Sequence, residues 1–223
     1  KYHNDINKRT TLETKLGVLE NFNPIIPENL KDSNIVVLGN LHPSVQNKSI
    51  AQLSGKNQFL ILDTMNFWMD NNLEDLNEVI SKVNLISIND EEAYLLAKEK
   101  SLDGCAHKII KKGPKYVIIK KGELGAELHS KDEKFSMPSF RIEAVDPTGA
   151  GDSFAGGVAT YLSKTNSIDF NSIKKGLILG TILASFTVEG LGTKSIEKVV
   201  KKKILDRLEK FIIKNKFDLN LSI

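Results

Sequence analysis

Four short and almost wholly apolar runs set the strongest limit on how this chain folds. They occupy residues 35–38, 59–62, 85–88 and 116–119, and segments with helical spacing separate them. Parallel strands that are covered on both faces appear in a sequence as continuous apolar runs, and helices alternate with them along the chain. The runs therefore predict an α/β fold with a mostly parallel sheet flanked by helices.

Helices are predicted where apolar residues recur every three or four positions. In residues 73–83, for example, Leu76, Val79 and Ile80 fall on one helical face. Residues 89–92 carry the acidic side chains typical of a first helical turn. Further helices are expected at residues 45–53, 104–112, 150–162, 171–188 and 203–214.

The pattern changes in the middle of the chain, where short apolar stretches alternate with polar turns. Residues 126–129, 134–137 and 140–145 are therefore predicted to form a small antiparallel meander at the edge of the sheet. The first 33 residues are polar and mixed, so irregular or edge-strand structure is expected there.

Composition excludes several classes of protein. The chain has 31 Lys and Arg against 28 Asp and Glu, and this scattered surplus of +3 argues against a nucleic-acid partner. No apolar run approaches the roughly 18 residues of a membrane span, so no membrane partner is expected. The single cysteine, Cys105, suits a reducing compartment, and a cytoplasmic location is predicted. His107 beside it makes no metal motif, because no second ligand pair follows at zinc-like spacing.

Residues 146–157 carry the clearest chemical signal, because they follow an expected strand and open an expected helix. Gly149 and Gly151 allow the backbone to approach a ligand closely. The amides of such a loop and of a helix N-terminus can bind a phosphate group. Asp152 falls in the first helical turn, where its carboxylate could accept a proton from a hydroxyl group that attacks the same phosphate.

Two other interpretations of these glycines are open. A simple turn with Asp152 as the helix N-cap would explain Gly-x-Gly-Asp equally well if the motif stood alone. A dinucleotide-binding fingerprint would need Gly or Ala at position 154, which is Phe154. It would also need a strand ending in an acid about 20 residues on, whereas Asp169 precedes a predicted helix. No P-loop motif is present in the sequence.

The stretch from Asp146 to Phe154 closely resembles the C-terminal signature of the PfkB family, the ribokinase-like carbohydrate and nucleoside kinases. Four further stretches resemble family motifs, and all of them occur in the family order. They are Asn89 to Glu92 (Asn-x-x-Glu), residues 121–126 (the Gly-x-x-Gly nucleotide loop), residues 63–68 (Asp-x-Asn) and residues 184–190 (the adenine-side helix end).

The resemblance implies a ribokinase-like kinase that moves the γ-phosphate of ATP to a hydroxymethyl group of a small-molecule sugar or nucleoside. It assigns Asp152 as general base and the backbone of Gly149, Ala150 and Gly151 as the anion hole. It implies nucleotide contacts at Lys120, Gly122, Gly125, Asn89, Glu92, Ala184 and Val188. It also implies Mg²⁺ organised by Glu92, and a monovalent cation such as K⁺ beside Asp146 and Thr148.

The sequence departs from the family pattern in two ways. Lys120 stands where the family commonly has Thr, which alters one nucleotide hydrogen bond. The family's opening strands and Gly-Gly substrate motif do not occur, and about residues 1–20 resemble the end of its lid. Residues 1–223 are thus expected to be an N-terminally incomplete kinase domain with a remnant of a β lid, which would allow a homodimer through that lid. The alternative is a non-catalytic nucleotide-binding protein, truncated or degenerate, although Asp152 favours the enzyme.

Overall fold

The computed structural model describes residues 12–19, 21–165 and 167–218. These residues group into two compact units. The sheet unit comprises Glu13–Lys121 and Glu127–Ser136, and the helical unit comprises Leu12, Gly122–Ala126 and the described residues from Met137 onward.

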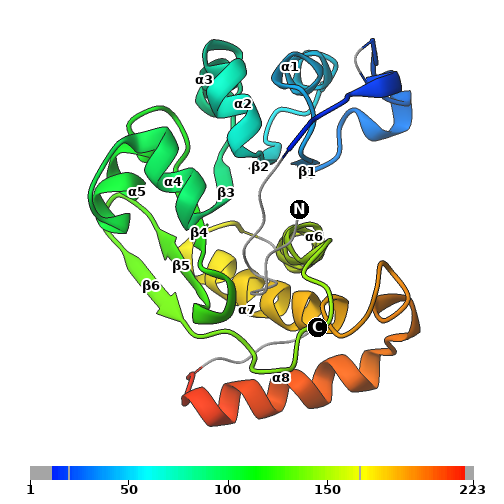
Figure 1. The fold of residues 1–223 in the computed structure, drawn as a ribbon, viewed down its shortest axis with the longest axis vertical. Helices are drawn as coiled ribbons and strands as arrows, with labels where there is room; N and C mark the ends of the chain where they lie inside the picture. Colours follow the sequence, from blue (N-terminus) through cyan, green and yellow to red (C-terminus); the bar gives the residue numbers. More distant parts are fainter. Residues whose placement is uncertain (1–11, 20, 166, 219–223) are drawn as a thin grey trace. The chain divides into compact units, whose positions relative to one another are not determined.

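The sheet unit is built on one mixed sheet whose strands follow the chain in the order β1-β2-β3-β4-β5-β6 (Figure 1). The first four strands pair in parallel, and Leu62 lies opposite Leu38 on one side and Ile86 on the other. These strands are β1 (Ile35–Leu38), β2 (Phe59–Asp63), β3 (Leu85–Asn89) and β4 (Tyr116–Lys120). All four predicted parallel strands are therefore confirmed.

A hairpin completes the sheet order. Strand β5 (Ala126–His129) and strand β6 (Lys134–Met137) are joined by a turn in which the Ser130 N–H donates to the Glu133 carbonyl at 2.8 Å. This turn confirms the first two strands of the predicted antiparallel part.

Helices cover one face of the parallel strands. They are α1 (Pro43–Ile50), α2 (Asn66–Asn71), α3 (Leu73–Lys82), α4 (Asp90–Ala97) and α5 (Leu102–Ile110). Their apolar side chains, such as Ile80 and Ile109, form one core with alternate strand residues such as Leu62 and Ile86. The intervening residue Ile61 points to the opposite face and is also buried, as the continuous apolar run predicts.

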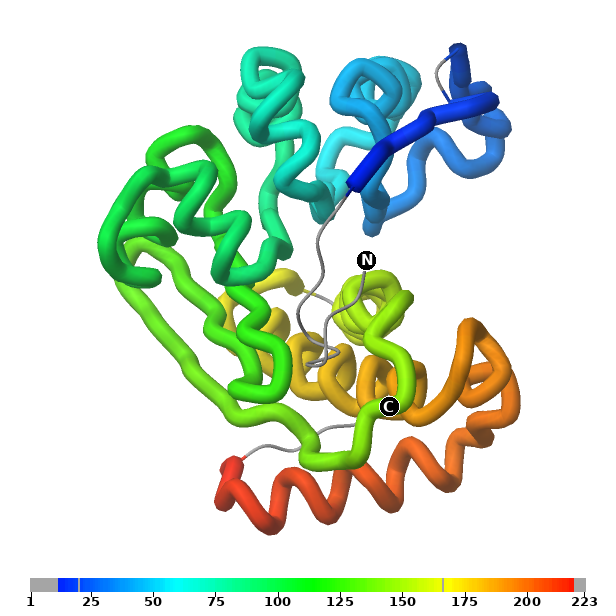
Figure 2. The backbone as a smooth tube through the Cα atoms, viewed as in Figure 1, coloured from blue at the N-terminus to red at the C-terminus, as the bar shows by residue number. Residues whose placement is uncertain are grey.

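The helical unit contains α6 (Ala150–Leu162), α7 (Phe170–Thr187) and α8 (Lys201–Asn215). Helices α6 and α7 lie side by side (Figure 2). Glycines make this approach close, because a Cβ atom on Gly157 would lie 2.6 Å from the Gly180 Cα atom. None of the helices in the described ranges is long and apolar enough to cross a membrane.

One predicted strand is wrong. Residues 140–145 form neither strand nor helix. Pro138 and Pro147 flank this segment and have no N–H to donate to a neighbouring strand. The N–H groups of Val145 and Asp146 donate instead to the Val188 carbonyl at the end of α7.

The predicted lid remnant falls mostly outside the described residues. Residues 1–11 and Glu20 are not described, and within residues 12–19 the chain forms a 3₁₀ turn at Gly17–Leu19 and no strand. A second 3₁₀ turn follows at Glu28–Leu30. The homodimer through the lid therefore stays a prediction.

Candidate active site

The predicted site residues are distributed over both units. The helical unit holds Gly122, Gly125, Asp146, Thr148, Gly149, Ala150, Gly151, Asp152, Ala184 and Val188. The sheet unit holds Asn89, Glu92 and Lys120.

The glycine loop ends in a left-handed residue at the start of α6. Gly149 is the N-cap of this helix with φ 82° and ψ −1°, a conformation that favours glycine. The helical hydrogen-bond ladder begins with the Ser153 N–H, which donates to the Gly149 carbonyl at 3.0 Å. The amides of Gly151 and Asp152 precede this bond. They are the donors that a helix N-terminus offers to an anion.

The beginning of the loop is fixed to the last turn of α7. The Val145 and Asp146 N–H groups donate to the Val188 carbonyl at 2.7 and 3.2 Å. The Thr148 N–H donates to Asp146 Oδ1 at 2.9 Å, and this bond lowers the pKa of the Asp146 carboxyl group. Asp146 is therefore a carboxylate at neutral pH. The structure brings together Asp146, Thr148 and Val188, three of the predicted residues.

Asp152 lies in the first turn of α6 and its side chain is exposed. The neighbouring Ser153 accepts a hydrogen bond of 2.6 Å from the Thr187 hydroxyl group of α7. Thr187 also lies beside Gly149, where an added Cβ atom would be 3.5 Å from its methyl group. Helix α7 therefore contacts the chain on both sides of Asp152, at Gly149 and at Ser153. The Asp152 carboxylate itself is exposed and accessible to a reactant.

The turn between β4 and β5 depends on its two glycines. Gly122 begins a 3₁₀ turn with φ 54°, and the Gly125 N–H donates to the Gly122 carbonyl at 3.1 Å. Gly125 has φ 99°, and a Cβ atom there would overlap the backbone of Met137 and Pro138. The turn therefore accounts for the Gly-x-x-Gly pattern by backbone geometry alone.

In the sheet unit, polar side chains gather at the carboxyl ends of β2, β3 and β4. Asp63 lies opposite Ser87, and Asn89 lies opposite Lys120. Because side chains alternate along a strand, these four share one face of the sheet. Ligands of parallel α/β sheets bind at this end of the strands.

An ion pair and an unpartnered hydroxyl group occupy this edge. Lys120 Nζ lies 3.0 Å from Asp63 Oδ1, and the two side chains are only 20% and 14% exposed. Ser87 Oγ is buried and has no hydrogen-bond partner among the residues that the structure describes. The sequence did not reveal the Lys120–Asp63 pair, because its members lie 57 positions apart and meet only through the strand register.

The Asn-x-x-Glu motif starts α4. Asn89 Oδ1 accepts from the Glu92 N–H at 2.8 Å, and Glu92 Oε2 accepts from the Asn89 N–H at 2.8 Å. This reciprocal pair is a capping box. Glu92 is only 4% exposed, unlike an ordinary acid at a helix start, so its carboxylate is held against the end of β3.

Arg207 of α8 was also not predicted from the sequence. Its guanidinium group bonds the Glu189 carboxylate at 2.9 and 3.0 Å and lies 3.5 Å from the centre of the Phe186 ring. A cavity of about 660 Å³ adjoins this group, and neither Ala184 nor Val188 lines it. The predicted adenine-side residues therefore lie outside this cavity.

The sequence pattern of the pfkB family carbohydrate kinases matches residues 7–199. The chain belongs to this family. Among relatives of this pfkB-family chain, inositol 3-kinase of Arabidopsis thaliana is 27% identical over 143 residues, which are 62% of the chain and 36% of that protein. Cytidine kinase of Thermococcus kodakarensis is 28% identical over 174 residues, 75% of the chain and 61% of that protein.

Solved structures confirm the ribokinase-like fold. Ribokinase of Thermotoga maritima superimposes with a TM-score of 0.64 at 27% identity, covering 82% of this chain and 58% of that one. A putative ribokinase II of E. coli, solved in complex with ATP and Mg²⁺, gives a TM-score of 0.66 at 22% identity, covering 85% and 62%. The chain thus spans about three fifths of each of these solved chains.

Proposed function

We propose that this protein is an ATP-dependent phosphotransferase that moves the γ-phosphate to a hydroxymethyl group of a sugar or nucleoside. The observation that carries the proposal is the loop from Asp146 to Asp152, with Gly149 in the left-handed conformation at the start of α6. Membership of the pfkB family supports it, as do relatives named as kinases of inositol and of cytidine.

In the proposed reaction, an acceptor hydroxyl oxygen attacks the γ-phosphorus while the bond to the bridging oxygen of ADP breaks. Asp152 takes the hydroxyl proton, and its exposure in the first helical turn suits that role. The loop of Gly149, Ala150 and Gly151 acts as the anion hole for the charge that develops on the phosphoryl oxygens. Because the Ala150 N–H already donates to the Pro147 carbonyl at 3.1 Å, the Gly151 N–H contributes most directly.

The nucleotide contacts are assigned in each unit separately. In the sheet unit, the Lys120 ammonium group, oriented by Asp63, binds nucleotide phosphate together with Asn89. In the helical unit, the turn at Gly122 and Gly125 and the α7 residues Ala184 and Val188 line the nucleotide. A lysine is a common phosphate ligand, so Lys120 serves where the family commonly has Thr.

The oxygen donors suit hard cations, which prefer carboxylate and carbonyl ligands. Glu92 would organise Mg²⁺, through water or directly, and Asp146 with Thr148 would hold a monovalent cation such as K⁺. The pKa of Asp146 is lowered by the Thr148 N–H, so its carboxylate is available to a cation at neutral pH. Mg²⁺ would neutralise charge on the nucleotide phosphates.

The test is ADP formation by the protein at its natural length with a panel of sugars, polyols and nucleosides in the presence of Mg²⁺. Phosphorylation of at least one acceptor is expected, with the phosphate on a hydroxymethyl group. Nucleotide binding without turnover on any acceptor would favour the alternative, a non-catalytic nucleotide-binding protein. That alternative is tested because the chain matches only 36% of the inositol 3-kinase and 61% of the cytidine kinase.

A further inference from the structure

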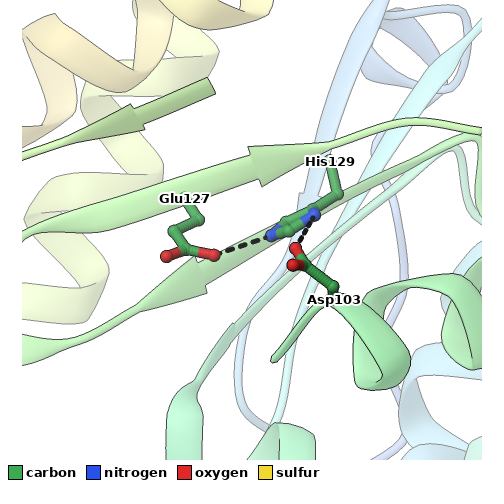
Figure 3. A group of neighbouring side chains, drawn as sticks. All are labelled: Asp103, Glu127 and His129. Carbon is green, nitrogen blue, oxygen red and sulfur yellow. Dashed lines mark hydrogen bonds and ion pairs between the residues drawn. The ribbon is translucent and has the colours of Figure 1, made fainter. Parts of the chain in front are cut away.

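Three side chains that can ligate a metal ion converge in the sheet unit, and none of them is among the residues assigned above. Glu127 and His129 project from the same face of β5, and Asp103 lies in the first turn of α5 (Figure 3). One ligand atom from each lies within 4.8 Å of the other two. The side chains of Glu127 and His129 are 10% and 6% exposed, whereas that of Asp103 is 68% exposed.

A lysine ammonium group marks the position of a cation in this cluster. Lys134 Nζ lies 2.6 Å from Asp103 Oδ1 and 3.3 Å from Glu127 Oε2, and so bridges the two carboxylates. The Lys134 side chain is 43% exposed and can turn into solvent. Lys121 is held differently, because it bonds the other Glu127 oxygen, Oε1, at 2.7 Å and is only 19% exposed. Departure of Lys134 alone would therefore leave Glu127 Oε2 for another cation.

The imidazole ring of His129 supplies a nitrogen ligand. Its Nε2 atom lies 3.0 Å from Glu127 Oε2, and its Nδ1 atom lies 3.7 Å from Asp103 Oδ1 (Figure 3). A neutral imidazole ring can offer a metal ion the lone pair of one ring nitrogen. The Glu127 carboxylate lies beside Nε2, whereas the Asp103 carboxylate lies beside Nδ1. An ion bound by Nε2 and Glu127 would therefore be reached by Asp103 only if its exposed side chain rotates toward the ion.

We propose that Asp103, Glu127 and His129 bind one Zn²⁺ ion, or a transition-metal ion of similar chemistry, by displacing the ammonium group of Lys134. One imidazole nitrogen with two carboxylate oxygens suits Zn²⁺, whereas Mg²⁺ prefers oxygen ligands alone. A cavity of about 230 Å³ is lined by Asp103, His129 and Lys134 and offers the ion a path from solvent. The site is distinct from the Mg²⁺ position proposed at Glu92.

The test is a Zn²⁺ titration against a chromophoric chelator, with excess Mg²⁺ present throughout. The wild-type protein should bind one Zn²⁺ ion. His129→Gln should weaken binding by more than the about 10- to 100-fold that loss of an outer-sphere partner costs. Lys134→Met should strengthen binding, because it removes the competing cation. His107→Gln is the matched control, since His107 is exposed and lines the same cavity without belonging to the ligand group.

Opposite effects of the two substitutions distinguish a metal site from a purely structural charge network. Equal Zn²⁺ affinity in wild type and His129→Gln, or no gain in Lys134→Met, would overturn the proposal. If His129→Gln does not fold, Asp103→Asn replaces it, because Asp103 is exposed. That variant should keep the wild-type melting temperature without metal and lose the increase that Zn²⁺ gives the wild type. No step of the test uses kinase activity, so its outcome is independent of the proposed function.

Discussion

Substituting alanine for two adjacent glycines of α6, Gly156 and Gly157, should change the free energy of unfolding in opposite directions. In Gly157→Ala the new Cβ atom would lie 2.6 Å from Gly180 Cα and 2.9 Å from Gly180 N. These are backbone atoms of α7, so the two helices must move apart to accept the new atom. A clash this close should cost about 3 kcal/mol, which is the upper end of typical overpacking costs. Alanine returns about 1 kcal/mol of helix propensity. The net loss in the free energy of unfolding is about 2 kcal/mol.

Gly156→Ala is the control, because nothing lies within 4 Å of a Cβ atom at that position. It should stabilise the protein by about 1 kcal/mol through helix propensity alone. For a chain of this size the melting temperature should fall by about 4–8 °C in Gly157→Ala and rise by about 2–4 °C in Gly156→Ala. Calorimetric melting of both variants measures the difference. A Gly157→Ala protein as stable as the wild type would refute the close packing of α6 on α7, which positions the glycine loop.

Three further predictions concern charged side chains. Lys120→Met should weaken ATP binding, measured by calorimetry, about tenfold or more. The control Lys115→Met, at the other end of β4, should leave ATP affinity unchanged. Equal ATP affinities of the two variants would show that Lys120 does not bind the nucleotide. Glu92→Gln should raise the Mg²⁺ concentration needed for half-maximal activity while α4 stays intact, because Gln also forms a capping box; an unchanged Mg²⁺ titration would contradict the assignment. Although burial raises the pKa of Glu127, Lys121, His129 and Lys134 together outweigh it, and the net pKa is lowered. The stability that Glu127 contributes is therefore present above its unfolded pKa and lost as pH falls through its folded pKa. The free energy of unfolding, measured with denaturant over a series of pH values, should therefore fall less steeply at acid pH in Glu127→Gln than in the wild type. The same pH dependence in both proteins would refute this.

The parallel sheet could be predicted because its strands are buried on both faces and carry almost no polar residues. The strand predicted at residues 140–145 was wrong, since their alternating pattern resembles a strand while the Val145 N–H group bonds the end of α7. Helix α5 begins at Leu102, two residues before its predicted start, because the Ser101 side chain accepts from the Gly104 N–H. Serine is a favoured N-cap residue, so Ser101 is the sequence signal for this start.

The candidate site could be predicted only in part, because local motifs form recognisable sequence patterns whereas tertiary contacts do not. The glycine loop and the capping box at Asn89 are local, and both are visible as short patterns. The pair of Lys120 with Asp63 and the cluster around His129 depend on strand register and on the docking of a helix. No spacing in the sequence encodes those contacts, so they appeared only with the fold.

The central claim is that Asp152 accepts the proton of the attacking hydroxyl group. The most direct measurement is the turnover of Asp152→Asn on the identified acceptor, together with its affinity for ATP. Loss of a general base should lower kcat by about a hundred- to ten-thousandfold, with ATP affinity unchanged. Asp169→Asn is the matched control, because Asp169 caps α7 and Asn caps a helix equally well. Turnover of Asp152→Asn near the wild-type rate would contradict the account.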